Sequence, residues 1–157
     1  MRFTSLATAL TTLSAASARI VGIEAPSTLA PNSKFNLTLL TGSYVQSVDD
    51  ISVAWGYAIA PGYPASLGAF SQSSYLGPKK SNTLEKITVE ATVPDGLSSD
   101  SYNGTLVLTA GVYSLYGASA GPVVAGFTVE VQVGDETSTE LVKSNGTAWN
   151  VNSQSKA

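Results

Sequence analysis

The chain has 157 residues, no cysteine, no histidine and a formal net charge of −3. Without cysteine or histidine, Ser-His-Asp and Cys-His nucleophiles are impossible, and zinc and copper lose their preferred ligands. The mild acidity and the lack of a basic block give no electrostatic footprint for nucleic acid or an anionic membrane. We therefore expect a binding protein that is not an enzyme and needs no cofactor.

The first 18 residues have the pattern of a secretory signal peptide. Arg2 supplies an early cation, a short apolar run follows, and Ala16-Ser17-Ala18 has the A-x-A form of a cleavage site. We expect cleavage after Ala18, which leaves a mature chain that starts at Arg19. The apolar run is too short and too rich in threonine for a membrane anchor, so the sequence predicts a secreted protein.

Residues 19–133 alternate between apolar and polar side chains, which is the pattern of half-buried β-strands. The expected strands cover residues 20–25, 35–39, 51–57, 87–93, 106–112 and 127–133, and residues 113–117 extend the fifth of these or bend away from it. Trp55 falls on the apolar face of its strand and is expected in the core. Six or seven short antiparallel strands predict an all-β, immunoglobulin-like or fibronectin-like β-sandwich, with a jelly roll as the alternative.

Two regions lack this alternation. Residues 58–84 form a long connection rich in proline and glycine, and such loops are usually functional or disordered. Residues 134–157 are polar, with Trp149 isolated among them, and are predicted to be a flexible tail.

The long connection supplies the predicted partner contacts. Tyr63, Tyr75 and Leu76 are candidate apolar anchors, because exposed aromatic residues often carry the binding energy of an interface. Lys79 and Lys80 form the only adjacent pair of cations and could meet an acidic patch on a partner. The alternative is that this loop only closes one end of the sandwich and that the partner binds elsewhere, for instance at the tail.

Three N-x-S/T sequons predict glycosylation at Asn36, Asn103 and Asn145. Asn36 gains support because the alternation places it on the polar face of its strand. A pair of carboxylates, as in glycoside hydrolysis, is the one catalytic arrangement that the composition leaves open. The carboxylates lie mostly at turns or on polar strand faces, where a solvated role is expected: Glu24, Asp49, Asp50, Glu85, Glu90, Asp95, Asp100 and Glu130.

Several segments together resemble the fungal necrosis-inducing secreted protein family. The similarity runs from about residue 19 to residue 141 and includes the absence of cysteine. It is carried by Ser43–Ile51, Ala60–Pro64, Ser74–Pro78, Tyr113–Gly117, Gly121–Val124 and Val133–Thr139.

This resemblance implies a secreted effector of a plant-associated fungus, linked to host cell death and to suppression of pattern-triggered immunity. The implied partners are host plant protein kinases, both receptor-associated and receptor-like cytoplasmic ones. No catalytic motif is carried over. A fold without disulfides would tolerate the reducing host cytoplasm as well as the apoplast. The alternative function is a secreted carbohydrate-binding or cell-wall-binding module.

Overall fold

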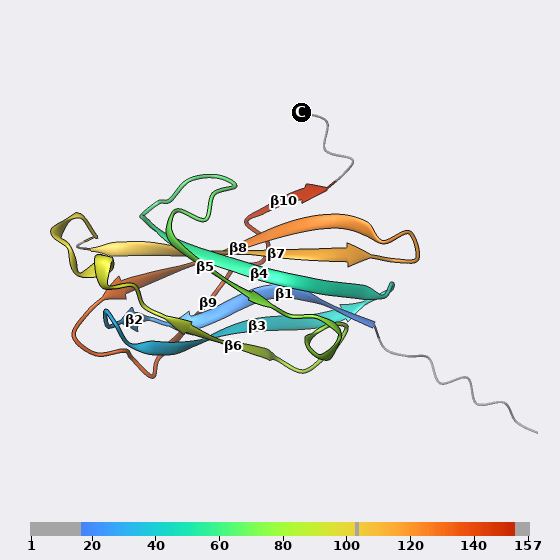
Figure 1. Cartoon of the computed structure of the whole chain (residues 1–157), viewed down its shortest axis with the longest axis horizontal. Helices are drawn as coiled ribbons and strands as arrows, with labels where there is room; N and C mark the ends of the chain where they lie inside the picture. The colour runs from blue at the N-terminus through green and yellow to red at the C-terminus, as the bar shows by residue number, and fades with distance from the viewer. Residues whose placement is uncertain (1–16, 103, 153–157) are drawn as a thin grey trace, which may run out of the picture.

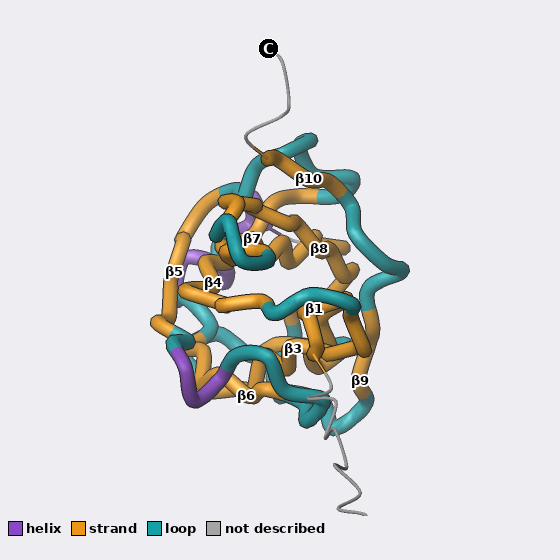
Figure 2. The backbone as a smooth tube through the Cα atoms, turned by 90° about the vertical axis from the view of Figure 1, so that its right-hand side faces the viewer, coloured by secondary structure: helices purple, strands orange, loops and turns teal. Residues whose placement is uncertain are grey.

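A computed structural model describes residues 17–102 and 104–152 as two β-sheets packed face to face (Figure 1). One sheet has four strands in the order β6-β3-β1-β9. The other has six, in the order β10-β8-β7-β4-β5, with β2 parallel to β8. Figure 2 shows the two layers end-on, with the β1, β3, β6 and β9 layer below the β4, β7, β8 and β10 layer.

The strands are β1 (Ser17–Pro26), β2 (Thr28–Leu29), β3 (Lys34–Tyr44), β4 (Val48–Ile59), β5 (Ala69–Tyr75), β6 (Ile87–Thr92), β7 (Thr105–Tyr116), β8 (Gly121–Val133), β9 (Leu141–Lys143) and β10 (Trp149–Asn152). Three short 3-10 turns are η1 (Pro78–Lys80), η2 (Asp95–Ser98) and η3 (Asp100–Tyr102). The predicted all-β sandwich is confirmed, and its immunoglobulin-like or fibronectin-like subtype stays a prediction. No helix within the described ranges is long and apolar enough to cross a membrane.

The core lies between the sheets and follows the alternation of the sequence. Each strand sends every second side chain inward, so apolar positions two residues apart meet the opposite sheet. Trp55 is 2% exposed and confirms its predicted core position. The residues 113–117, which were expected to extend the fifth strand or leave it, continue β7 as far as Tyr116, which pairs with Gly121.

The structure corrects the prediction of a flexible tail from residue 134. Within this region β9 pairs with β1, and β10 pairs with β8 through the register Trp149↔Gly126. The backbone N–H of Ile23 also donates to the Ser144 hydroxyl at 2.9 Å. Strands of three and four residues are too short to show a period in the sequence, which is why the alternation missed them. Residues 153–157 lie outside the described part of the chain.

Two segments cover the outer face of the six-stranded sheet. The Trp149 indole lies over Gly126, where any added Cβ would overlap the ring, and reaches Gly111 on β7. The connection between β4 and β5 lies over the same face, since a Cβ placed at Gly62 would be 3.4 Å from the Val107 side chain. Val107 is therefore buried although it faces away from the core.

Candidate functional site

The long connection of residues 58–84 is more regular than the sequence predicted. It contains β5, which pairs with β4 through the register Ser52↔Tyr75 to Tyr57↔Ala69, and it contains η1. β5 consists mainly of serine and glutamine with both faces partly exposed, so it shows no apolar alternation. The predicted irregular loop is thus limited to the segments on either side of this edge strand.

Tyr63 and Tyr75 are exposed, as the prediction of partner contacts requires, with exposed fractions of 73% and 70%. They lie near opposite ends of β5, since Tyr75 ends the strand and Tyr63 lies in the loop before it. Seven residues of strand span roughly 20 Å. One small partner group cannot contact both tyrosines, so the candidate residues form two separate sites.

The prediction that Leu76 contacts a partner is wrong. Leu76 is 4% exposed and belongs to the core between the sheets. Its backbone N–H donates to the Ile51 carbonyl at 2.9 Å, so the β-pairing continues one residue beyond β5. Because strand side chains alternate, an exposed Tyr75 places Leu76 on the buried side.

The two predicted lysines lie on η1 and differ in their surroundings. Lys79 is exposed, whereas Lys80 is half-buried and its ammonium donates to the Thr88 carbonyl at 3.3 Å. Lys79 is therefore the cation better placed to meet a partner, and it follows Pro78, which lines the recess beside Tyr75.

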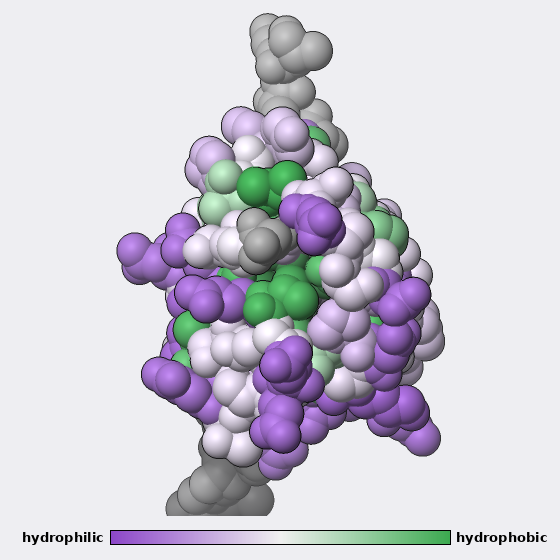
Figure 3. All heavy atoms as spheres, turned by 90° about the vertical axis from the view of Figure 1, so that its left-hand side faces the viewer, coloured by the Kyte–Doolittle hydropathy of each residue, from purple (hydrophilic) through white to green (hydrophobic). Residues whose placement is uncertain are grey.

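The first recess, at the Tyr63 end, has a volume of about 340 Å³. Its walls are mainly aromatic and aliphatic: Tyr57, Ala58, Ile59, Tyr63, Ser66, Gly68, Ala69 and Tyr102. Figure 3 looks onto the end of the sandwich that carries η2 and η3 and shows apolar residues at its centre among hydrophilic ones. Ile59 contributes an exposed apolar side chain to this recess, with 54% of its surface accessible.

The second recess, at the Tyr75 end, has a volume of about 260 Å³. It combines an exposed aromatic ring with acidic and aliphatic walls: Asp49, Asp50, Ile51, Tyr75, Gly77, Pro78 and Ser81. Gly77 has a φ of 65° and lies against the Tyr75 ring, where a Cβ would meet ring atoms at 2.5 Å. A residue with a side chain would therefore be strained at this position and would push the ring aside.

Asp50 anchors the floor of the second recess. Its carboxylate accepts a hydrogen bond from the Ser114 hydroxyl at 2.6 Å, and its backbone N–H donates to the Ser81 hydroxyl at 2.6 Å. Burial raises the pKa of Asp50, a hydrogen bond from Ser114 and one from the Asn82 backbone oppose the rise, and Asp49 adds to it. These contacts fix the segment after η1 against β4.

Because the pKa of Asp50 is higher in the folded chain than its ordinary value of 3.8, the folded state holds this proton more tightly than the unfolded state. The contribution of Asp50 to stability therefore falls as pH rises above about 4. We expect the unfolding free energy of Asp50→Asn, relative to the wild type, to increase between about pH 4 and pH 7. Urea denaturation across this range measures it, and a constant difference would contradict the burial of a titrating Asp50.

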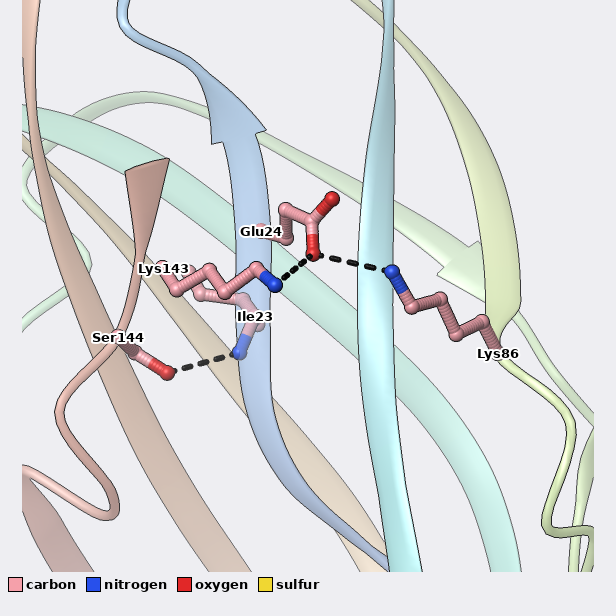
Figure 4. Close-up of polar contacts among 5 residues, drawn as sticks. All are labelled: Ile23, Glu24, Lys86, Lys143 and Ser144. Carbon is pink, nitrogen blue, oxygen red and sulfur yellow. Dashed lines mark hydrogen bonds and ion pairs between the residues drawn. The ribbon is translucent and has the colours of Figure 1, made fainter. Parts of the chain in front are cut away.

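The other buried carboxylate, Glu24, is paired with two lysines and so has a role in holding its sheet together (Figure 4). It lies between Lys86, at 3.2 Å, and Lys143, at 3.5 Å, and so links the end of β9 to the rest of its sheet. Glu24 and Asp50 belong to different sheets. No group of three potential metal-ligating side chains occurs within residues 17–102 and 104–152.

The predicted glycosylation sites are dispersed. Asn36 is exposed on β3, opposite Glu90, and Asn145 is exposed between β9 and β10. Asn103 lies outside the described residues. Glycosylation at all three positions stays a prediction, and neither Asn36 nor Asn145 lines the recess beside Tyr63 or the one beside Tyr75.

Comparison with known proteins gives consistent matches. A family model described as the Nis1 family matches residues 16–132. Necrosis-inducing secreted protein 1 of Colletotrichum orbiculare is 44% identical over 151 residues, covering 96% of this chain and 91% of the relative. Necrosis-inducing secreted protein 1 of Colletotrichum higginsianum is 43% identical over 141 residues, covering 89% of this chain and 95% of the relative.

Among solved structures, the superoxide reductase (neelaredoxin) from Ignicoccus hospitalis aligns with 75% of this chain and 83% of its own. The TM-score is 0.45 and the sequence identity is 15%. A likeness at this level assigns neither a common fold nor an activity.

Proposed function

Because the chain belongs to the Nis1 family, we propose that this secreted protein is a fungal effector that promotes necrosis and suppresses pattern-triggered immunity in host plants. We propose that it does so by binding receptor-associated and receptor-like cytoplasmic immune kinases rather than by catalysis. The observation that carries the proposal is 44% identity, across 96% of the chain, to a protein named for secretion and for inducing necrosis.

The Tyr75 end of β5 is the surface that best supports binding to a protein partner. Tyr75 is 70% exposed, and Lys79 lies next to the same recess. The segment behind them is held by Ser81, which donates to the Val48 carbonyl at 2.8 Å and accepts from Asp50. A surface that is already ordered loses little conformational entropy on binding.

Binding to the purified cytoplasmic domain of a plant receptor kinase tests the proposal directly. We expect the wild type to bind and Tyr75→Ala to weaken the affinity by about thirtyfold, the effect of losing one central aromatic anchor. Lys79→Ala should mainly slow association and reduce its dependence on salt. Surface plasmon resonance measures the affinity and both rate constants.

Tyr113→Ala is the matched control, because Tyr113 is 38% exposed on the outer face of the six-stranded sheet. It should bind the kinase as the wild type does. No binding by the folded wild type to any member of a panel of such kinases would refute kinase binding itself. Normal binding by Tyr75→Ala would refute only the assignment to this end of β5.

A carbohydrate-binding function is the second candidate, because the recess beside Tyr63 is lined by Tyr102 and Ile59 and resembles the apolar sites that take small ligands. Pull-down on chitin, glucan and cellulose tests it. Retention that Tyr63→Ala abolishes and Tyr75→Ala leaves intact would favour this function. Passage of the wild type through all three matrices would exclude it for these polymers.

A further inference from the structure

The first strand of the fold begins before the N-terminus that the cleavage pattern predicts. β1 starts at Ser17, which pairs with Tyr44, and Ala18 pairs with Ser43. Ala18 has no accessible surface at all. Cleavage after Ala18 would therefore remove a fully buried residue and two pairs of the β1–β3 ladder.

The backbone of Ala18 also takes part in a specific polar contact. Its N–H donates to the Oδ1 atom of Asn82 at 2.9 Å, across 64 residues of sequence. Asn82 has a left-handed φ of 49°, and its backbone is also hydrogen-bonded to the Asp50 carboxylate. Ala18 thus holds the same segment that Ser81 fixes against β4, and a chain without Ala18 leaves the Asn82 side chain without this donor.

Three overlapping positions in the sequence satisfy the small-residue requirement of signal peptidase, namely cleavage after Ala16, after Ser17 (with Ala15 as the third residue before the cut) and after Ala18. Cleavage after Ala18 uses Ala16 and Ala18 as the third and first residues before the cut, and cleavage after Ala16 uses Ser14 and Ala16. The pattern alone does not separate them. The fold separates them, because only cleavage after Ala16 keeps both Ser17 and Ala18, which belong to β1, in the mature chain.

We propose that secretory processing hydrolyses the Ala16–Ser17 amide bond, so that the mature protein starts at Ser17. Water adds across this bond, Ala16 leaves with the new carboxylate, and Ser17 keeps the new amine, which takes up a proton. No oxidant or cofactor is needed. The match to the family model, which begins at residue 16, agrees with a domain that includes both residues.

The proposed start also preserves the surroundings of Arg19. With Ser17 and Ala18 present, Arg19 is an internal residue of β1 opposite Gly42, and its guanidinium lies 4.7 Å from the centre of the Tyr44 ring. Tyr44 in turn meets Tyr116 edge-on, with ring centres 5.5 Å apart. A chain that began at Arg19 would place a free terminal ammonium beside this cation–π contact and release the strand end that positions it.

Translation in vitro with microsomes tests the cleavage position without requiring the product to fold. Mass spectrometry of the processed chain should give an N-terminus at Ser17. Ser14→Asp should abolish or shift this cleavage, because Ser14 is the third residue before the proposed cut. Ala18→Leu should leave the cleavage unchanged, because Ala18 lies after the cut. An N-terminus at any residue other than Ser17, or a cleavage that Ala18→Leu blocks, would overturn the proposal.

The structural reason has its own test. Chains that start at Ser17 and at Arg19 can be released from a cleavable fusion and compared by thermal unfolding. The Arg19 chain should melt at least about 3 °C lower, since it lacks a buried residue, a hydrogen bond and two strand pairs. Equal melting temperatures would show that Ser17 and Ala18 contribute nothing to the fold and would remove the basis of the inference.

Discussion

Trp55→Ala should lower the free energy of unfolding by about 3–5 kcal/mol. The indole is 2% exposed on β4, which lies between β7 and β5 in the six-stranded sheet. The substitution removes the buried ring and leaves a cavity between the two sheets, because the close-packed core cannot relax to fill it completely. Equilibrium denaturation in urea, followed by circular dichroism, measures the change.

Tyr63→Ala is the control, because it also removes a large aromatic ring but from a side chain that is 73% exposed. The free energy of unfolding of Tyr63→Ala should stay within about 0.5 kcal/mol of the wild-type value. The chain has no disulfide that could hold the sheets together after the core is weakened. A loss below about 1 kcal/mol for Trp55→Ala would mean that Trp55 is not a core residue.

The long strands could be predicted because each buries one face against the opposite sheet. On β6, for example, Ile87, Val89 and Ala91 are buried while the residues between them are exposed. This alternation follows directly from strand geometry and needs no knowledge of the partner strand. The order of the strands in each sheet depends on contacts between distant segments, so the sequence did not reveal it.

β5 and the tail strands were missed for physical reasons. β5 is an edge strand whose serine and glutamine side chains meet water on both faces, so burial imposes no period on its sequence. β10 pairs with β8 and packs one aromatic ring on a glycine, and nothing in the local sequence connects Trp149 with Gly126, which lies 23 positions earlier. Because β5 was not predicted, the side chain of Leu76, which directly follows it, could not be assigned to the buried face, and this explains the error at Leu76.

At the candidate site, the exposure of the two tyrosines followed the prediction, but their environments did not follow from the sequence. Tyr75 lies beside the buried residue Asp50, whose carboxylate accepts a hydrogen bond from the Ser114 hydroxyl and whose backbone N–H donates to the Ser81 hydroxyl. A buried acid is rare enough that sequence reasoning assigned Asp50 a solvated role. The network that buries it becomes visible only when β4, β7 and the segment after η1 are brought together.

Gly126→Ala should cost about 1–3 kcal/mol and release the C-terminal segment, because the new methyl group would occupy the space of the Trp149 indole. The backbone of Gly126 lies in β8, where alanine is otherwise tolerated. Displacement of the ring should break the pairing of β10 with β8. A red shift of the tryptophan emission and faster proteolysis within residues 144–152 measure the release.

Gly121→Ala is the matched control on the same strand, because its added methyl group meets no atom closer than 3.7 Å. It should leave both stability and emission unchanged. The decisive comparison places Gly126→Ala in a Trp149→Ala background, where the methyl group no longer meets a ring. If the methyl group clashes only with the indole, Gly126→Ala should lower the free energy of unfolding by less than about 0.5 kcal/mol in the Trp149→Ala background. An equal cost in both backgrounds would show that Trp149 does not lie on Gly126 and that the tail is held in another way.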